Sequence, residues 1–405
     1  MKSVRDSLYS NANYVSEVIF DCQTLQPDYL IAHIDTMVSI WQSTAWSSKI
    51  DFNQFCRYIL PFRALNEPRS QWSTLLAQKY KSTADSFINI LSAAKAINRL
   101  LADDMKYLRC WMGSLGLQSI PNLIISKSGM CDDLSVYGIC AMRACGIPAA
   151  VDFTIWAKRD IGHSWGVIFD EDGKPIRFGP GEQNPGEHKI IFSQSEYRKL
   201  AKVFRRTFEI NHSGLWSKVD NIEAIPPFFR QRNILDVTSE YTNTFDLVMP
   251  VKMSEAKDNL VYICVFNSNK WTPVHWAMVK NNNATFLAMG NDILYLIGRF
   301  DGEMIVPVSP PFIFNKYFKV NYLTGNGGLS QPVIIQNNSW GLGLLKSLEP
   351  HKLYKWNIDD WTYVCEIYPN TDFSLSLSNL SEQTLYKFEG RQRPFTIKDN
   401  IIIWW

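Results

Sequence analysis

One cysteine and one histidine near the middle of the chain have the spacing expected of a nucleophile and its base. Cys131 falls in the first turn of a predicted helix, two residues after Gly129, and His163 follows 32 residues later at the start of a predicted strand. Unpaired N–H groups and the helix dipole favour a thiolate in a first turn, although Asp132 and Asp133 oppose it. Such a pair attacks an acyl carbon, forms a thioester, and passes the acyl group to water or to an amine.

Glycine, proline and the alternation of apolar residues define the elements that would position this pair. The helix is predicted over 132–145, with Gly146 as its C′ residue and Pro148 preventing its continuation. Strands are predicted over 149–156, 163–169 and 174–178, a loop over 179–186, and a basic helix over 195–206. The local pattern leaves a second interpretation open, because helical cysteines are more often buried core residues, as Cys140 and Cys145 are predicted to be.

Three motifs in this stretch resemble the core of the transglutaminase-like superfamily. They are Gly129-x-Cys131, Arg143-Ala144-Cys145-Gly146-Ile147-Pro148-Ala149 and His163-Ser164-Trp165. Segments 51–61, 152–154 and 403–405 also look similar to large, multi-domain Bacteroidetes proteins of this kind. The resemblance implies a papain-like fold in which Cys131 is the nucleophile and His163 the base, acting on a peptide or protein substrate. Hydrolysis and transfer, and the identity of the amide, stay open.

The resemblance also implies an acidic residue that orients the imidazole, on the strand after His163 and followed by proline. Gly179 stands at that position before Pro180, and Glu182 is the nearest substitute. Asp170 and Asp172 belong to the predicted turn, where we expect them to face solvent. The third member is therefore Glu182, a residue from elsewhere in the chain, or missing. Because orientation by a carboxylate matters greatly in such triads, an enzyme and a protein without activity are both open.

Periodicity predicts a multi-domain α+β protein. Helical spacing over 28–46, 51–60 and 83–111 predicts a helical N-terminal region at 1–115, followed by the transglutaminase-like core at 116–229. After residue 235 the period changes to two, and turn residues recur at intervals typical of β-sandwiches. Trp271-Thr272-Pro273-Val274 resembles 361–364, and Leu294-Tyr295 resembles Leu385-Tyr386. This short repeat predicts two related β-sandwich-like modules, at 230–318 and 319–405.

Composition excludes several classes of function. A net charge of +2 argues against a nucleic-acid surface, and no apolar run reaches the ~18 residues of a membrane span. The eight cysteines form neither a disulfide framework nor a CxxC pair, and HExxH is absent, so no metal and no other cofactor is predicted. The residues after Met1 lack the apolar stretch of a signal peptide. The family resemblance nevertheless implies export to the periplasm or cell surface, with a leader removed, while a cytoplasmic location stays open.

The alternative to an enzyme is a retained scaffold whose β modules bind a glycan or a peptide. Its aromatic surface would come from five tryptophans, each of which is also an ordinary choice for a sandwich core: Trp271, Trp276, Trp340, Trp356 and Trp361. In either case we expect Trp165 to be a core residue and Arg143 to have a structural role near the end of its helix.

Overall fold

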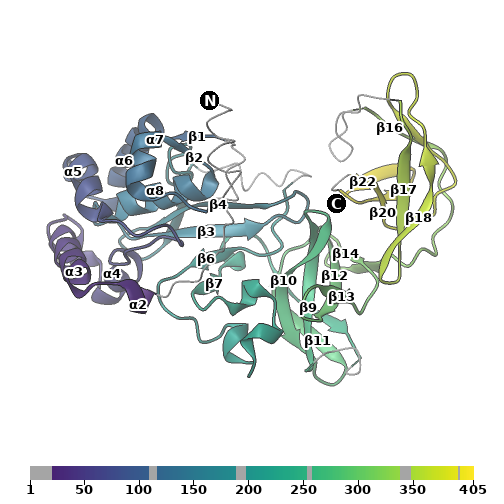
Figure 1. The fold of residues 1–405 in the computed structure, drawn as a ribbon, viewed down its shortest axis with the longest axis horizontal. Coiled ribbons are helices and arrows are strands. Elements are labelled where there is room, and N and C mark those ends of the chain that lie inside the picture. Colours follow the sequence, from purple (N-terminus) through teal and green to yellow (C-terminus); the bar gives the residue numbers. More distant parts are fainter. Residues whose placement is uncertain (1–20, 109–115, 188–197, 253–257, 338–347, 391–392) are drawn as a thin grey trace.

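The computed structural model describes residues 21–108, 116–187, 198–252, 258–337, 348–390 and 393–405. Helices gather at one end of the molecule, an antiparallel sheet runs through its centre, and two further β regions form the other end (Figure 1). This is the mixed α+β, multi-domain composition that the sequence predicts. Within the described ranges, no helix is long and apolar enough to cross a membrane.

In the described residues, the α-helices lie between positions 21 and 143. Their bounds are α2 Asp21–Thr24, α3 Pro27–Gln42, α4 Phe52–Tyr58, α5 Trp72–Ala84, α6 Ile90–Asp104, α7 Ile120–Ser126 and α8 Cys131–Arg143. The predicted helices at 28–46 and 51–60 correspond to α3 and α4. Asp51 caps α4, since its carboxylate accepts a hydrogen bond from the Gln54 amide at 2.7 Å.

The single long helix predicted over 83–111 is wrong. α5 ends at Ala84, α6 occupies 90–104, and Lys106–Tyr107 form the short strand β1, which pairs with β2 (Ser128–Gly129). The cause is Asn89, whose side chain accepts a hydrogen bond from the Ser92 amide at 2.8 Å and caps a new helix. The end of the prediction, with Cys110, lies outside the described residues.

The central sheet has the strand order β5-β4-β3-β6-β7. Its strands are β3 Ala149–Ile155, β4 Gly162–Phe169, β5 Pro175–Phe178, β6 Phe204–Arg206 and β7 Ile234–Asp236. α8 packs on one face of it, where Ile139 and Met142 share a hydrophobic cluster with Val151 and Ile168. The three strands predicted after Pro148 are thus present.

The basic helix predicted over 195–206 is wrong in its described part. Leu200 forms a β-bridge with Trp156, and β6 pairs with β3. Lys202 is 1% exposed although its neighbours in sequence suggest a solvated helix face. Contacts with distant residues, which local propensity does not report, hold this segment extended. Residues 195–197 lie outside the described ranges.

Two β regions follow, and their strands pair in the same order. The first has a sheet ordered β10-β9-β12-β14-β15, with β13 also on β12, and a pair β11-β8; the second has β18-β17-β20-β21-β22 and a pair β16-β19. The bounds in the first are β8 Phe245–Pro250, β9 Leu260–Asn267, β10 Lys270–Met278, β11 Asn283–Met289, β12 Ile293–Phe300, β13 Ile305–Pro307, β14 Phe312–Phe314 and β15 Val320–Tyr322. Those in the second are β16 Val333–Ile335, β17 His351–Asn357, β18 Asp360–Ile367, β19 Leu375–Leu377, β20 Tyr386–Phe388, β21 Phe395–Lys398 and β22 Ile401–Trp404.

The residues of the short sequence repeat occupy corresponding places in these two sheets. Trp271 and Trp361 are each the second residue of the returning strand of a hairpin, opposite Phe266 and Trp356 respectively. In each region the large sheet and the two-stranded pair contribute side chains to one hydrophobic cluster. The boundaries of the four predicted domains stay a prediction.

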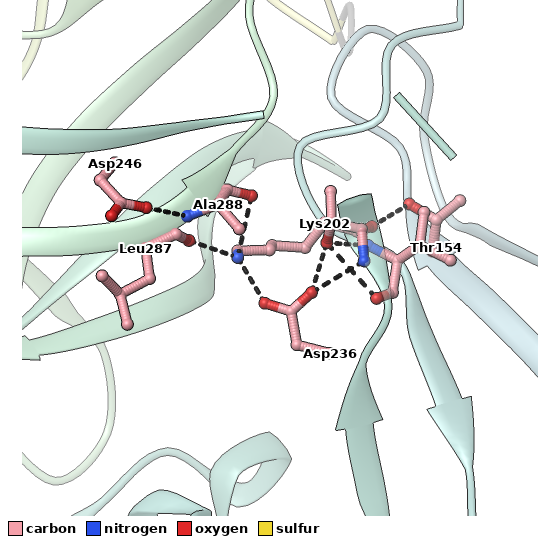
Figure 2. Close-up of polar contacts among 8 residues, drawn as sticks. Thr154, Lys202, Asp236, Asp246, Leu287 and Ala288 are labelled. Atoms are coloured by element: carbon pink, nitrogen blue, oxygen red, sulfur yellow. Dashed lines mark hydrogen bonds and ion pairs between the residues drawn. The ribbon is translucent and has the colours of Figure 1, made fainter. Parts of the chain in front are cut away.

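A buried lysine joins the central sheet to the first β region (Figure 2). The Lys202 ammonium donates hydrogen bonds to the Asp236 carboxylate at 2.5 Å and to the carbonyl of Leu287, in β11, at 2.6 Å. Thr154, at the end of β3, donates its hydroxyl to the Lys202 carbonyl at 2.7 Å. Burial lowers the pKa of Lys202, whereas the nearby Asp236 carboxylate raises it. A paired internal charge therefore fixes how the β region sits against the sheet.

Candidate active site

Cys131 is the first residue of α8, as the sequence predicts for the nucleophile. The helix start is fixed by Asp133, whose carboxylate accepts hydrogen bonds from the Met130 amide at 3.1 Å and the Gln118 amide at 3.0 Å. Gly129 is required here, because a Cβ at this position would lie 2.4 Å from the Cβ of Asp133. The motif Gly-x-Cys thus serves to place a thiol on an unobstructed helix N-terminus.

His163 lies near the start of β4, and its ring is held between two tryptophans. It stacks on Trp156 with ring centroids 6.1 Å apart and an interplanar angle of 17°, and it lies 5.8 Å from the Trp165 ring. Ser164, the next residue, points the other way and contacts Ser135 of α8 at 3.3 Å. The His163 ring therefore lies on the side of β4 opposite to the Ser164 hydroxyl, beside Trp156 and Trp165.

One cavity of about 260 Å³ brings the three predicted site residues together. Cys131, His163 and Glu182 all line it, with Trp156 and Trp165 among the walls. Trp165 is 1% exposed, so it is mainly the core residue that the sequence suggested, with one edge on the cavity. Neither the Cys131 thiol nor any carboxylate of the described residues forms a hydrogen bond with the His163 ring. The same described ranges contain no group of three His, Cys, Asp or Glu side chains suited to a metal ion.

Electrostatics keep both members of the pair neutral. Burial raises the pKa of the Cys131 thiol, and the Asp132 carboxylate raises it further, against hydrogen bonding from Ser164. Burial lowers the pKa of His163 to about 4, and the positive charges of Arg198 and Arg159 contribute to the shift. Asp132 thus disfavours the thiolate, as the sequence predicts. Its carboxylate also accepts a 2.5 Å hydrogen bond from the Ser164 hydroxyl. At neutral pH the site holds a thiol and an uncharged imidazole.

The orienting acid was expected in the turn after β5, but Gly179 occupies the expected position, next to the end of the strand. The Gly179 amide and carbonyl close a tight turn with Gln183 and Glu182 at 2.9 Å each. Pro180 packs against α8 at Gly138, where a Cβ would lie 2.5 Å from the Cβ of Pro180. Glu182 is exposed, and partial burial raises its pKa. Its side chain lines the cavity without a hydrogen bond to a described residue.

A buried polar network behind Trp165 was not found by sequence reasoning. The Trp165 indole N–H donates to the Tyr241 hydroxyl at 2.9 Å, which donates to the Asp152 carboxylate at 2.5 Å. Arg205 forms a two-point ion pair with Asp152, each contact at 2.8 Å, and also reaches Glu240 at 2.6 Å. A lone Asp in the apolar strand Ala149–Ile155 was the available signal, because a buried carboxylate needs a partner. The network fixes the indole of Trp165, which lies beside the His163 ring.

Arg143 has the structural role expected of it. It is 3% exposed and donates to the carbonyls of Tyr58, Pro61 and Arg63 at 3.1, 3.1 and 2.7 Å, as well as to Ala149. The Arg-Ala-x-Gly-Ile-Pro block therefore ties α8 to the helical region. Gly146 has φ of +71°, which suits its predicted place at the helix end.

The loop beside His163 is held by the β regions. Asn267, at the end of β9, donates its side-chain amide to the carbonyls of Trp156, Arg159 and Ile161, each at 2.9 Å. Its side-chain oxygen accepts from the Ile161 amide at 3.1 Å. Arg393, from the second region, pairs with Asp160 at 2.5 Å. The β regions thus set the shape of one wall of the cavity, which the sequence did not indicate.

Two solved structures resemble parts of this chain. One is a candidate cysteine protease from Cytophaga hutchinsonii, with 24% sequence identity and a TM-score of 0.24 over 28% of this chain and 40% of that chain. The other is a TGase, with 14% identity and a TM-score of 0.22 over 45% of this chain and 37% of that chain. The chain spans less than half the length of either structure, and similarity at these TM-scores carries no argument about function. No protein-family model and no curated protein matches the sequence.

Proposed function

We propose that the chain is a transglutaminase-like cysteine enzyme that cleaves or transfers peptide or isopeptide amides through a thioester at Cys131. The observation that carries the proposal is the shared cavity, which is lined both by a thiol on a helix N-terminus and by an imidazole held by two tryptophans. The Gly-x-Cys and Arg-Ala-x-Gly-Ile-Pro motifs support it, because each has a positioning role that this site needs.

The chemical steps follow from these two side chains. His163 takes the proton of the Cys131 thiol while the sulfur attacks the amide carbon. We propose that N–H groups in the first turn of α8, which begins at Cys131, donate to the resulting oxyanion. The tetrahedral intermediate then collapses, the C–N bond breaks, and His163 gives its proton to the leaving amine. Water, or a second amine, attacks the thioester and returns the thiol.

Proton transfer is unfavourable in the structure without substrate. From a thiol at its ordinary pKa of 9.0 to an imidazole of about 4, the transfer costs ~7 kcal/mol before the attraction between the two charges that form is counted. Binding of the substrate must therefore raise the basicity of His163. We propose that Glu182 contributes, since it lines the cavity and its exposed side chain is free to rotate towards the ring when substrate displaces water.

We place this chemistry in a papain-like core at 116–229, between a helical region at 1–115 and β-sandwich-like modules at 230–318 and 319–405. Support comes from the packing of α8 on the central sheet and from the clusters shared by the paired sheets of each β region. By family resemblance we propose an exported protein, acting in the periplasm or at the cell surface of a Bacteroidetes bacterium.

Turnover of p-nitrophenyl acetate tests the proposal without knowledge of the natural substrate. We expect the wild-type protein to release more than one equivalent of nitrophenolate, and Cys131→Ala to release it only at the background rate. His163→Ala should lower the rate by about 100-fold or more, the usual contribution of a positioned base. Cys56→Ala, which changes a half-buried cysteine of α4, is the matched control and should keep the wild-type rate. Equal rates for wild type and Cys131→Ala would rule out the proposed nucleophile.

A second candidate function, binding without catalysis, is favoured by another cavity. This cavity of about 470 Å³ has walls from both β regions, including Trp271, Trp356 and Trp361. The Trp271 and Trp356 rings lie 5.6 Å apart at 83°, and Trp356 and Trp361 lie 5.2 Å apart at 85°. Trp276 is half-buried, and Trp340 lies outside the described residues. Quenching of tryptophan fluorescence by a soluble oligosaccharide, abolished in Trp356→Ala, would favour this function; no quenching by oligosaccharides or peptides would remove it.

A further inference from the structure

The loop between β3 and β4 carries three consecutive charged residues, and two of them are turned towards the β regions. The Lys158 ammonium lies 4.1 Å from the centroid of the Trp405 ring. Asp160 accepts hydrogen bonds from Arg393 at 2.5 Å and from the Ser268 amide at 2.8 Å. Arg159, between them, lines the cavity that contains Cys131 and His163. Asp160, the acidic residue next to Arg159 in sequence, is thus paired with Arg393.

The backbone of Arg159 is fixed although its side chain is exposed. Its carbonyl accepts a 2.9 Å hydrogen bond from Asn267, which is 4% exposed. The side-chain amide of Asn267 also donates to the carbonyls of Trp156 and Ile161, and Ile161 adopts a left-handed conformation with φ of +59°. Such a conformation is uncommon for a β-branched residue, so the contacts with Asn267 must stabilise it. The guanidinium therefore projects from a preorganised loop.

A second guanidinium, that of Arg198, lines the same wall. Its segment lies beside the end of β3, because the Ala157 amide donates to the Lys199 carbonyl at 3.3 Å and Leu200 bridges to Trp156. Arg159 and Arg198 are close enough for each positive charge to lower the pKa of His163, and that of Arg159 also lowers the pKa of Arg198. Glu182, which follows β5, is the acidic residue lining the cavity. Two guanidinium groups thus line the cavity beside a neutral nucleophile and base.

We propose that Arg159 and Arg198 bind a carboxylate of the substrate, so that the amide attacked by Cys131 belongs to an acidic peptide. This inference rests on the proposed function and names its substrate class. Guanidinium groups are suited to carboxylates because they present paired donors in a plane. A bound carboxylate would also offset the two positive charges near His163, and it would thereby make the imidazole a better base. The carboxylate is either an acidic side chain or a chain terminus.

Alkylation of Cys131 with matched reagents tests this electrostatic preference separately from catalysis. Iodoacetate and iodoacetamide form the same S–C bond with loss of iodide, but only iodoacetate carries a negative charge. Mass spectrometry of the Cys131 peptide gives the rate with each reagent, and their ratio is compared with that for glutathione. We expect the iodoacetate-to-iodoacetamide ratio to exceed that of glutathione by about fivefold or more, the factor for ~1 kcal/mol of one partly exposed ion pair.

Substitutions assign this preference to the two arginines. Arg159→Gln and Arg198→Gln should each lower the ratio towards the glutathione value, whereas Lys174→Gln, an exposed lysine outside the cavity lining, should not. Two small competitors distinguish the sources of the carboxylate. N-acetylalanine should slow alkylation of Cys131 by iodoacetamide if the site takes a terminal carboxylate, and N-acetylglutamate α-amide should do so if it takes a side-chain carboxylate. N-acetylalanine amide, which is neutral, is the control. A ratio equal to that of glutathione, unchanged by both substitutions, would overturn the inference. Nitrophenyl acetate turnover that depends on Cys131 would still uphold the proposed function in that case.

Discussion

Replacing Asn267 with leucine should loosen the loop beside His163 while keeping the side-chain volume almost unchanged. The substitution removes the two N–H donors that serve three carbonyls and the oxygen that accepts from the Ile161 amide. At about 1 kcal/mol net for each of the polar groups lost, the two N–H donors and the one oxygen, we expect a cost of ~3 kcal/mol. Asn267 is 4% exposed and its side-chain bond to the Trp156 carbonyl is buried, so water does not replace that partner in the folded state.

Amide hydrogen exchange and urea unfolding measure this cost at two levels. If the loop opens locally, exchange at Ile161 should accelerate by about 100-fold, which corresponds to ~3 kcal/mol. Asn321→Leu, at the exposed middle position of β15, is the control and should change neither quantity by more than ~0.5 kcal/mol. Unchanged exchange at Ile161 together with a loss below ~1 kcal/mol would refute the view that Asn267 shapes the active-site wall.

Three further predictions concern the site and its support. Folded His163 has a pKa of about 4, so between pH 6.5 and 4 the unfolded chain binds a proton at this residue that the folded chain does not. Its contribution to the free energy of unfolding is therefore fully present above pH 6.5 and should fall by ~3 kcal/mol on acidification to pH 4. Urea unfolding of His163→Ala over the same pH range should lack this ~3 kcal/mol loss. Glu182→Gln should lower nitrophenyl acetate turnover by about tenfold or more if its carboxylate orients His163, and an unchanged kcat would remove it from the mechanism. Asp152→Ala should destabilise the protein by roughly 2–3 kcal/mol in thermal unfolding, because it removes the buried acceptor of Arg205 and Tyr241 while Glu240 still pairs with Arg205.

Local sequence signals were sufficient where one segment determines its own structure. Helical spacing over 51–60 predicts α4, whose start Asp51 caps, and Gly146 with Pro148 after α8 predicts the turn into β3. Period-two patterns with regular turns predict the β regions. The two helix errors have different causes: Asn89 is a capping signal that a long apolar stripe obscured, whereas burial of Lys202 depends on contacts with β11 that no local pattern contains.

The positions of Cys131 and His163 could be predicted, but most of their surroundings could not. The motif identifies the pair because its glycines and Arg143 have local geometric roles. By contrast, Asn267 reaches the loop from 106 residues away, and Arg205 reaches Asp152 from 53 residues away. Such partners become visible only when the chain is folded. The charge state of His163 depends in the same way on Arg198, which the sequence places far from it.

The central claim is that Cys131 is a nucleophile that His163 activates. Peptide mapping by mass spectrometry after brief exposure to p-nitrophenyl acetate measures where the acetyl group is carried. We predict a hydroxylamine-sensitive acetyl thioester at Cys131, formed faster than at half-buried Cys56 and Cys365 and strongly reduced in His163→Ala. Acetylation of Cys131 at the same rate as those two cysteines, and unaffected by His163→Ala, would contradict the account.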